Sequence, residues 1–504
     1  MSQGDVVESL LRSNDCYFLH EEQQMRTILL ETQCQLDMVE RQIEVLQAVL
    51  DTLHDQKTLL KSRIKRHKMA LAPIRKIPAE LITEIILFAV AEATAISPNG
   101  QSCSSAANIA PLRLSHVCRS WRETALFLQP LWTRLYLSSD QQYGSELLQT
   151  WLNRSGQRGL HFHVKLTSRP THSRHHLVQA LIAHSRRWHT IHLYTSGSTM
   201  AYLRDIRGHL PLLTEVKLVI SSPENIAGKV TDIFLDAPLL RSFHISSQEF
   251  WRTVPIFQIP WNQLNAYSVD DAGIHDCIEY LNQAPNLVEC RLLSRFAPVL
   301  PTSMVVHEHL RSLSLCDYRL LNHLHASQLE TLEVKWMSQE IYPMYQAIGD
   351  FIARSSSNLT HFTLCEWNRQ DTAIRASEII PVFQVLPNIV SLTLRNLVWN
   401  DDFFPPLTIS SNQSILLPKM QILHLELLFS HLQPRTRSRP ERLFDMIESR
   451  CTVPSGVVRL HTVFLRLNQS LFNSDGSNDS EEEEQTMIHR ISILKEVGMK
   501  IEIV

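Results

Sequence analysis

The first regular pattern of the chain is a heptad repeat between residues 25 and 70, preceded by a segment (1–24) that we expect to be flexible. Apolar side chains recur every seven residues in two series offset by three positions, with mostly polar residues between them. The series are Leu29, Leu36, Ile43 and Leu50, and Val39, Leu46, Leu53 and Leu60. The pattern predicts a coiled-coil helix over 25–70. We expect a homodimer through residues 29–64; the alternative is a long amphipathic helix that packs against its own chain.

Two shorter amphipathic segments follow the heptad region. Pro78 suits the first position of a helix, where its missing N–H costs nothing. Leu81, Ile85 and Phe88 then lie at positions i, i+4 and i+7, which places them on one stripe of a short helix. A second helix is predicted over 114–125, because its apolar residues keep the same helical spacing.

These two segments resemble the F-box. The first reads Ile-Pro-x-Glu-Leu-Ile-x-Glu-Ile over 77–85, and the second reads Leu-Ser-x-Val-Cys-Arg-x-Trp-Arg over 114–122. The family motif opens with an apolar residue, Pro and Glu, and closes on Val-Cys-Arg-x-Trp. We therefore expect an F-box-like module over 73–137. The stretch 91–110, rich in Ser, Asn, Gln and Ala, separates the halves by more than the usual family spacing, and we expect it to loop out.

The resemblance implies docking onto the small adaptor subunit of an SCF-type cullin–RING ubiquitin ligase. Apolar and aromatic anchors dominate the binding energy of protein interfaces, which suits the residue types at the matching positions. By that match, the adaptor-docking residues are Ile77, Pro78, Leu81, Ile85, Val117 and Trp121. Val117 and Trp121 would also hold the helices of the module together.

From Trp132 onward one six-residue pattern returns: an apolar residue, two others, an apolar residue, one other, and an apolar residue. Clear copies begin at Trp188, Leu213, Leu240, Leu287, Leu310, Leu329, Leu359, Ile389 and Met420, and weaker copies begin at Trp132, Leu264 and Leu460. Each copy places alternate side chains on one side of a short strand, and stacked strands would share one core. Segments between the copies, such as 272–282 and 344–353, are predicted as helices.

This repeating region resembles the irregular leucine-rich arrays that often follow an F-box. The expected fold class is therefore α/β: a coiled-coil helix, a small helical F-box-like module and an α/β leucine-rich-repeat solenoid over 138–472. Side chains between the inward ones would line a concave surface, and their mixed charge suits a protein substrate. The substrate-binding candidates there are Lys217, His244, Arg291, Glu333 and His361. We expect an acidic disordered loop over 473–485 and a C-terminal cap over 486–504.

The amino-acid composition indicates which classes of partner and which cellular compartment to expect. Lys and Arg number 48 against 51 Asp and Glu, a formal net charge of −3, which argues against nucleic acid as a partner. Nine cysteines without Cys-x-x-Cys spacing favour reduced thiols in a cytoplasmic or nuclear protein. No apolar run approaches the roughly 18 residues that span a bilayer, so we expect no membrane partner.

No motif for catalysis or phosphate binding stands out. The chain contains no Gly-x-Ser-x-Gly, P-loop or His-Glu-x-x-His sequence. A histidine cluster lacks Cys or acidic partners at metal-ligand spacing, so we expect no metal and no cofactor. Its members are His161, His163, His172, His175 and His176. We predict a non-enzymatic adaptor that recruits a substrate for ubiquitin-dependent degradation. The alternatives are a coiled-coil/repeat scaffold without ligase docking, and an enzyme whose site lies in the repeat loops.

Overall fold

The structure is a computed structural model of the 504-residue chain. It describes residues 8, 11–12, 19–94, 106–138, 145–166, 172–221, 230–247, 256–270, 281–293, 304–336, 342–355, 358–366, 376–398, 402–410, 414–428, 441–451, 456–467, 489–496 and 498–503. The chain divides into two compact units, Met1–Ile82 and Thr83–Val504. Each unit is described by itself below. The predicted acidic loop at 473–485 lies outside the described residues.

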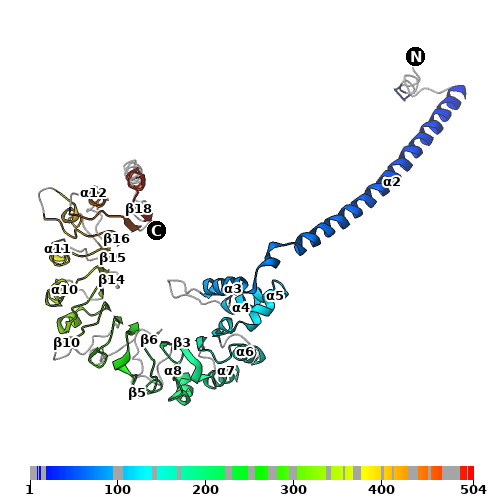
Figure 1. Ribbon diagram of the computed structural model, residues 1–504. Coiled ribbons are helices and arrows are strands. Elements are labelled where there is room, and N and C mark those ends of the chain that lie inside the picture. The colour runs from blue at the N-terminus through cyan, green and yellow to red at the C-terminus, as the bar shows by residue number, and fades with distance from the viewer. Residues whose placement is uncertain are drawn as a thin grey trace. The chain divides into compact units, whose positions relative to one another are not determined.

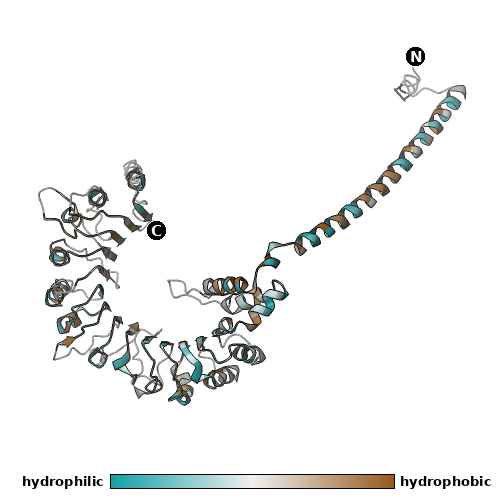
Figure 2. Ribbon diagram, viewed as in Figure 1, coloured by the Kyte–Doolittle hydropathy of each residue, from teal (hydrophilic) through white to brown (hydrophobic). Residues whose placement is uncertain are grey.

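The first unit is dominated by one helix, α2 (Leu19–Ala70), of 52 residues. The predicted helix over 25–70 is confirmed, and it begins six residues earlier than the heptads suggested. His67 and Lys68 lie in its last turn, where positive charge is favourable to the helix dipole. A short 3₁₀ turn, η1 (Pro73–Lys76), follows. Apolar and polar residues alternate along α2 in Figure 2, and its heptad side chains are exposed.

The helix α3 (Ala79–Thr94) begins directly after Pro78, as predicted, and the border between the two units lies within it. The prediction of one helix over 114–125 is wrong. The chain forms α4 (Ala106–Ser115) and α5 (Arg119–Phe127) instead, because Cys118 adopts an extended backbone (φ −159°, ψ 177°) that starts a new helix. The expected loop at 91–110 is helical at both ends, and its residues 95–105 lie outside the described part.

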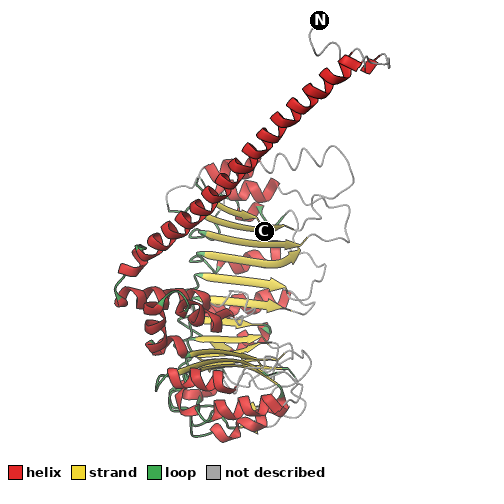
Figure 3. Cartoon of the chain, turned by 90° about the vertical axis from the view of Figure 1, so that its right-hand side faces the viewer, coloured by secondary structure: helices red, strands yellow, loops and turns green. Residues whose placement is uncertain are grey.

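The second unit contains a 14-stranded sheet in which every neighbouring pair is parallel. Its strands follow the order of the chain, and Figure 3 shows their arrows pointing the same way. They are β1 (Arg134–Ser138), β2 (Leu160–Lys165), β3 (Trp188–Thr195), β4 (Glu215–Ile220), β6 (Ser242–Ser247), β8 (Ala266–Asp270), β9 (Glu289–Leu293), β11 (Ser312–Leu315), β13 (Thr331–Trp336), β14 (His361–Glu366), β15 (Ser391–Val398), β16 (Ile422–Leu428), β17 (Thr462–Leu467) and β18 (Lys500–Ile503). Two separate two-stranded ladders pair β5 (Val230–Thr231) with β7 (Ile256–Phe257), and β10 (Val305–Val306) with β12 (Leu324–His325).

Strands form where the six-residue pattern predicted them, and their side chains alternate in burial. In β4, Val216, Leu218 and Ile220 are fully buried, whereas the residues between them are half-buried. Each strand therefore has one side in a continuous apolar core and one side on the opposite face. All twelve copies, clear and weak, contribute a strand to the sheet. The sheet also includes β2, which no copy predicted, and β18, which falls in the expected C-terminal cap.

Helices cover one face of the sheet, on the outer side of its curve in Figure 1. The α-helices are α6 (Ser145–Arg154), α7 (His172–Ile182), α8 (Gly197–Met200), α10 (Tyr342–Ser355), α11 (Ala376–Gln384) and α12 (Glu441–Ser449), and the 3₁₀ turns are η2 (Gln129–Trp132), η3 (Ser185–Arg187), η4 (Ala201–Ile206), η5 (Trp261–Gln263), η6 (Tyr318–His323) and η7 (Pro405–Leu407). The predicted helix at 344–353 is confirmed within α10. The one predicted at 272–282 lies almost entirely outside the described residues.

Buried polar side chains at three places bond to the backbone of the segment before them. The indole Nε1 of Trp188 donates to the carbonyl of Leu181, seven residues back (3.1 Å), and Trp132 donates in the same way to Ala125 (2.9 Å). Arg450, 1% exposed, donates to three backbone carbonyls of the preceding segment, those of Leu407, Leu416 and Leu417, at 2.8–3.1 Å. Burial lowers the pKa of this guanidinium to about 10. These bonds satisfy polar groups that the stacked core would otherwise leave unpaired.

Candidate protein-interaction surfaces

The face of the sheet opposite the helices, here called the inner face, carries lateral rows of side chains, of which one runs through all fourteen strands. Cα pairing from strand to strand links one residue of each strand across the sheet, at the spacing of about 4.8 Å between neighbouring strands. This central row runs Tyr136, His163, His192, Lys217, His244, Ser268, Arg291, Ser314, Glu333, Thr363, Thr393, His424, Phe464 and Glu502.

The N-terminal part of the central row is built from aromatic and imidazole rings. The Tyr136 and His163 rings lie 5.5 Å apart between centroids, and the His163 and His192 rings lie 5.6 Å apart at 66°. Beside them, His161 and His189 form a further ring pair at 5.0 Å. This part of the inner face is thus a weakly polar platform of flat rings, the kind of surface that packs well against apolar and aromatic groups of a partner.

Charged side chains follow in the middle of the sheet, and the carboxylates of Asp270 and Glu215 are each bonded to a neighbouring side chain. Nε of Arg291 donates to Oδ1 of Asp270 at 2.8 Å, and Nε2 of His192 lies 3.1 Å from Oε1 of Glu215. Nε2 of His244 lies 3.8 Å from the other Asp270 oxygen, too far for a hydrogen bond. Asp270 is therefore engaged mainly by Arg291.

Burial keeps three histidines of this region neutral at physiological pH. The pKa values of His161, His163 and His244 are each lowered to about 4, chiefly because the surrounding protein removes water from the ring. For His244, the neighbouring charge of Asp270 acts in the opposite direction but does not overcome desolvation. The Nδ1 atom of His163 is buried without a hydrogen-bond partner.

The structure brings four of the five substrate-binding candidates into the central row: Lys217, His244, Arg291 and Glu333. Lys217 and His244 are direct Cα partners, and Glu333 lies two strands beyond Arg291. Its carboxylate accepts a hydrogen bond from Ser314 at 2.7 Å and lies 3.5 Å from Nζ of Lys335. The fifth candidate, His361, lies on the same face in the adjacent row, opposite Thr331 and Ser391.

Sequence reasoning missed the ring platform. The sequence pattern suggested a possible role for His161 and His163 only as metal ligands, and it suggested none for Tyr136. In the described part of the chain no three His, Cys, Asp or Glu side chains group closely enough to hold a metal ion, and the side chains of residues 172–176 are not described. The signal that identifies β2 is the alternation Leu-His-Phe-His-Val over 160–164.

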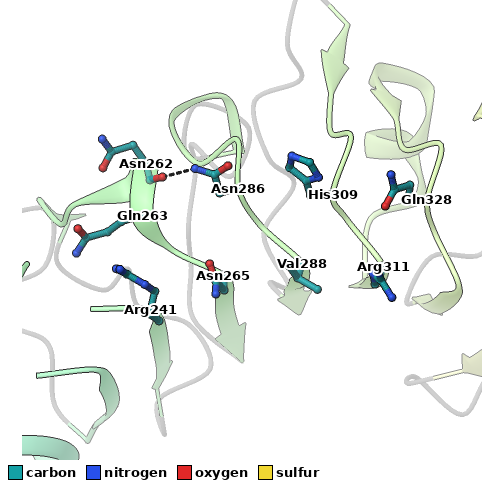
Figure 4. Close-up of a pocket in the computed structure, with 9 residues that line it drawn as sticks. All are labelled: Arg241, Asn262, Gln263, Asn265, Asn286, Val288, His309, Arg311 and Gln328. Carbon is teal, nitrogen blue, oxygen red and sulfur yellow. Dashed lines mark hydrogen bonds between the residues drawn. The ribbon is translucent and has the colours of Figure 1, made fainter. Parts of the chain in front are cut away.

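A second feature lies at the edge of the sheet where the strands begin. An open hollow of about 520 Å³ is formed by the residues just before β6, β8, β9 and β11 and by the turns that precede them (Figure 4). Its lining is Arg241, Asn262, Gln263, Asn265, Asn286, Val288, His309, Arg311 and Gln328. Several of these groups already bond to one another or to the backbone; the Asn286 amide donates to the Asn262 carbonyl at 2.6 Å. The lining is mostly polar and includes no carboxylate. The hollow therefore suits contact with backbone or side-chain amide groups of a partner.

The third feature is the exposed stripe of α3, formed by Leu81, Ile85 and Phe88. These side chains are 56%, 42% and 72% exposed. The opposite stripe of the same helix, Ile82, Ile86 and Val90, is buried. A helix whose two faces are both apolar, with only one of them covered, presents the other to a partner.

The remaining docking candidates divide between surface and interior. Val117 is 49% exposed, Pro78 is exposed and Ile77 is half-buried. Trp121 is 6% exposed, so its side chain packs inside the module and is not available to a partner; its role there is to hold the helices together. Phe127, 84% exposed at the end of α5, is an apolar surface residue that the sequence motif did not include.

No protein-family model matches the chain, and the comparison with the curated proteins found no match. Within the residues that the structure describes, no helix has the length and apolar character needed to cross a membrane.

Proposed function

We propose that this chain is a non-enzymatic substrate receptor of an SCF-type cullin–RING ubiquitin ligase. In this proposal the α3 region is an F-box-like module that binds the adaptor subunit, and the parallel sheet with its outer helices is a leucine-rich-repeat solenoid that binds a protein substrate on its inner face. The ligase's other subunits would perform the chemistry, and this chain would supply proximity and orientation.

The observation that carries the proposal is the exposed α3 stripe. Leu81 and Ile85 lie within the Ile-Pro-x-Glu-Leu-Ile-x-Glu-Ile segment, and Phe88 lies three residues beyond its end. The motif resemblance and the exposed apolar surface therefore coincide on one helix. Burying such a side chain against a partner is worth about 1.5–3 kcal/mol. Three such side chains on one helix face are sufficient for a binding hot spot in a specific interface.

The inner face supports the substrate-binding half of the proposal. Its central row combines rings, two basic residues and an acidic one within a short span of strands, and Arg291 and Glu333 of this row are already bonded within the sheet. A surface whose charges are matched internally costs less to desolvate on binding than one with isolated charges. That arrangement suits a folded or extended protein better than a polyanion.

The test of adaptor docking is co-purification of the full chain with a recombinant SCF adaptor subunit. We expect capture by the wild-type chain and at least a tenfold loss for Leu81→Ala/Ile85→Ala, because both side chains are exposed and their removal leaves the core of α3 unchanged. The matched control is Glu84→Ala, an exposed polar position on the same helix, which should bind as the wild type does.

Circular dichroism of each variant separates loss of docking from loss of folding. Failure of the folded wild-type chain to capture the adaptor would refute the ligase proposal and favour an interaction scaffold of the same architecture. Equal loss in the Glu84→Ala control would show that the helix as a whole, and not its apolar stripe, is being disturbed.

A further inference from the structure

The heptad stripe of α2 is an apolar surface that the proposed receptor function does not use. Its nine apolar core side chains, from Leu29 to Ile64, are 48–66% exposed although they recur at core spacing. Two positions interrupt the stripe: Thr32 in one series and Lys57 in the other. Their placement, together with the charges along the helix, determines which partner and which orientation the stripe fits.

A parallel pair of α2 helices would be opposed by its own charges. Parallel pairing places each core residue beside its own copy, so Lys57 would meet Lys57 of the second chain in the core. Residues 45–67 carry five basic and two acidic side chains, a net charge of +3, and they would lie beside the same +3 segment. The acidic segment 22–44, with net charge −3, would likewise lie beside itself.

An antiparallel pair reverses each of these disadvantages. When the two copies overlap along the whole of Leu19–Ala70, each first-series residue meets a second-series residue of the partner. Apolar residues then meet only apolar residues, and the polar interruptions meet each other. The facing pairs are Leu29 with Leu60, Leu36 with Leu53, Val39 with Leu50, Ile43 with Leu46, Met25 with Ile64, and Thr32 with Lys57.

The same overlap matches the charges. The segment 22–44 (−3) lies along the partner's 45–67 (+3), and Glu22 meets the partner's His67. Shifting the antiparallel pair by one heptad in either direction places Lys57 against Met25 or Val39 and shortens the overlap. Full overlap, apolar matching, polar matching and charge complementarity therefore select one register.

We propose that α2 forms an antiparallel homodimer with a second copy of this chain, with full overlap of the two helices. This inference goes beyond adaptor docking and does not depend on it. The pair has twofold symmetry about the midpoint of the helix, between Glu44 and Val45, as expected for a closed isologous dimer.

The test is disulfide crosslinking of the full chain on a Cys34→Ser background. The double variant Leu36→Cys/Leu53→Cys should form a covalent dimer on mild oxidation, whereas Leu36→Cys and Leu53→Cys alone should stay at the level of the background chain. Within one helix the two sites lie about 25 Å apart, so they cannot bridge internally. The matched control is Asp37→Cys/Thr52→Cys, which faces outward at the same overlap and should not crosslink efficiently.

Crosslinking by Leu36→Cys alone would show parallel pairing and overturn the proposal. A monomeric mass of the full chain by light scattering would overturn self-association altogether. Salt gives an independent readout that needs no substitution: raising NaCl from 0.05 to 0.3 M, across which screening becomes strong, should weaken an antiparallel dimer several-fold and strengthen a parallel one. A dimer that tightens with salt is therefore also contrary to the proposal.

Discussion

Acidification should destabilise the sheet unit through its buried histidines. His161, His163 and His244 have a pKa of about 4 in the fold, below the ordinary value of 6.5 that applies when the chain unfolds. Between pH 6.5 and 4 the unfolded chain binds protons that the folded chain does not, so stability is lost as the pH falls through this window. Above pH 7 both states are neutral and the effect disappears.

The magnitude follows from the two pKa values. A group with pKa about 4 folded and about 6.5 unfolded loses about 2 kcal/mol of stability between pH 7.5 and pH 5. Because His161 and His163 are only half-buried, we halve this to about 1 kcal/mol each to allow for solvent screening. With about 2 kcal/mol for the more deeply buried His244, the three histidines together lower the free energy of unfolding by about 4 kcal/mol between pH 7.5 and pH 5.

The assay is urea unfolding at pH 7.5 and pH 5.0, followed by far-ultraviolet circular dichroism. The sharpest variant is His163→Phe, which keeps a ring beside Tyr136, removes a buried unpartnered nitrogen and abolishes one titrating group. It should reduce the difference between the two pH values by about 1 kcal/mol. His116→Gln, at an exposed position, should leave it unchanged. An unaltered pH difference in His163→Phe would refute the reasoning.

Three further substitutions test the packing. Arg450→Met leaves three buried carbonyls without donors and should lower the free energy of unfolding in urea by about 3 kcal/mol, whereas Arg442→Met, at a half-exposed guanidinium, should cost under about 0.5 kcal/mol. Trp188→Phe loses an indole hydrogen bond and should cost about 1–2 kcal/mol by the same measurement. Gly156→Ala and Gly208→Ala each place alanine at a positive φ. Of the two, only Gly156→Ala would also bring the new Cβ against another side chain, that of Gln129 at 2.7 Å. Gly156→Ala should therefore lower the thermal midpoint of unfolding more than Gly208→Ala does.

The strands could be predicted because their periodicity records burial directly. Each copy of the six-residue pattern has one apolar residue at the entry and two on the buried side of the strand, and these are the positions that the sheet covers. The same phase placed Lys217, His244, Arg291 and Glu333 on one predicted concave surface, since all four occupy the fifth position of their copy. Parallel in-register stacking turns a shared position in the sequence into a lateral row.

Two features could not be read from periodicity. The six-residue pattern did not predict β2, because Leu160 lies two rather than three residues before Phe162. The pairing with β3 compensates through a register shift between Leu160 and His161. The break between α4 and α5 was not predicted, because Leu114 and Trp121 are seven residues apart. That spacing suits one continuous helix as well as two helices joined by a turn. In both cases the outcome depends on backbone geometry, which the spacing of apolar residues does not reveal.

An antiparallel α2 pair would also determine how two copies of the proposed receptor act together. The two Ala70 ends, where each helix leads into the rest of its chain, would lie about 77 Å apart at 1.5 Å per residue. A parallel pair would place them side by side. Two inner faces attached at such distant points can engage one substrate together only if it is large, oligomeric or extended, and then the second contact benefits from a high effective concentration. Compact monomeric substrates should therefore bind a dimeric receptor no more tightly than a monomeric one made by Leu36→Asp/Leu53→Asp, whereas multivalent substrates should lose affinity in that variant.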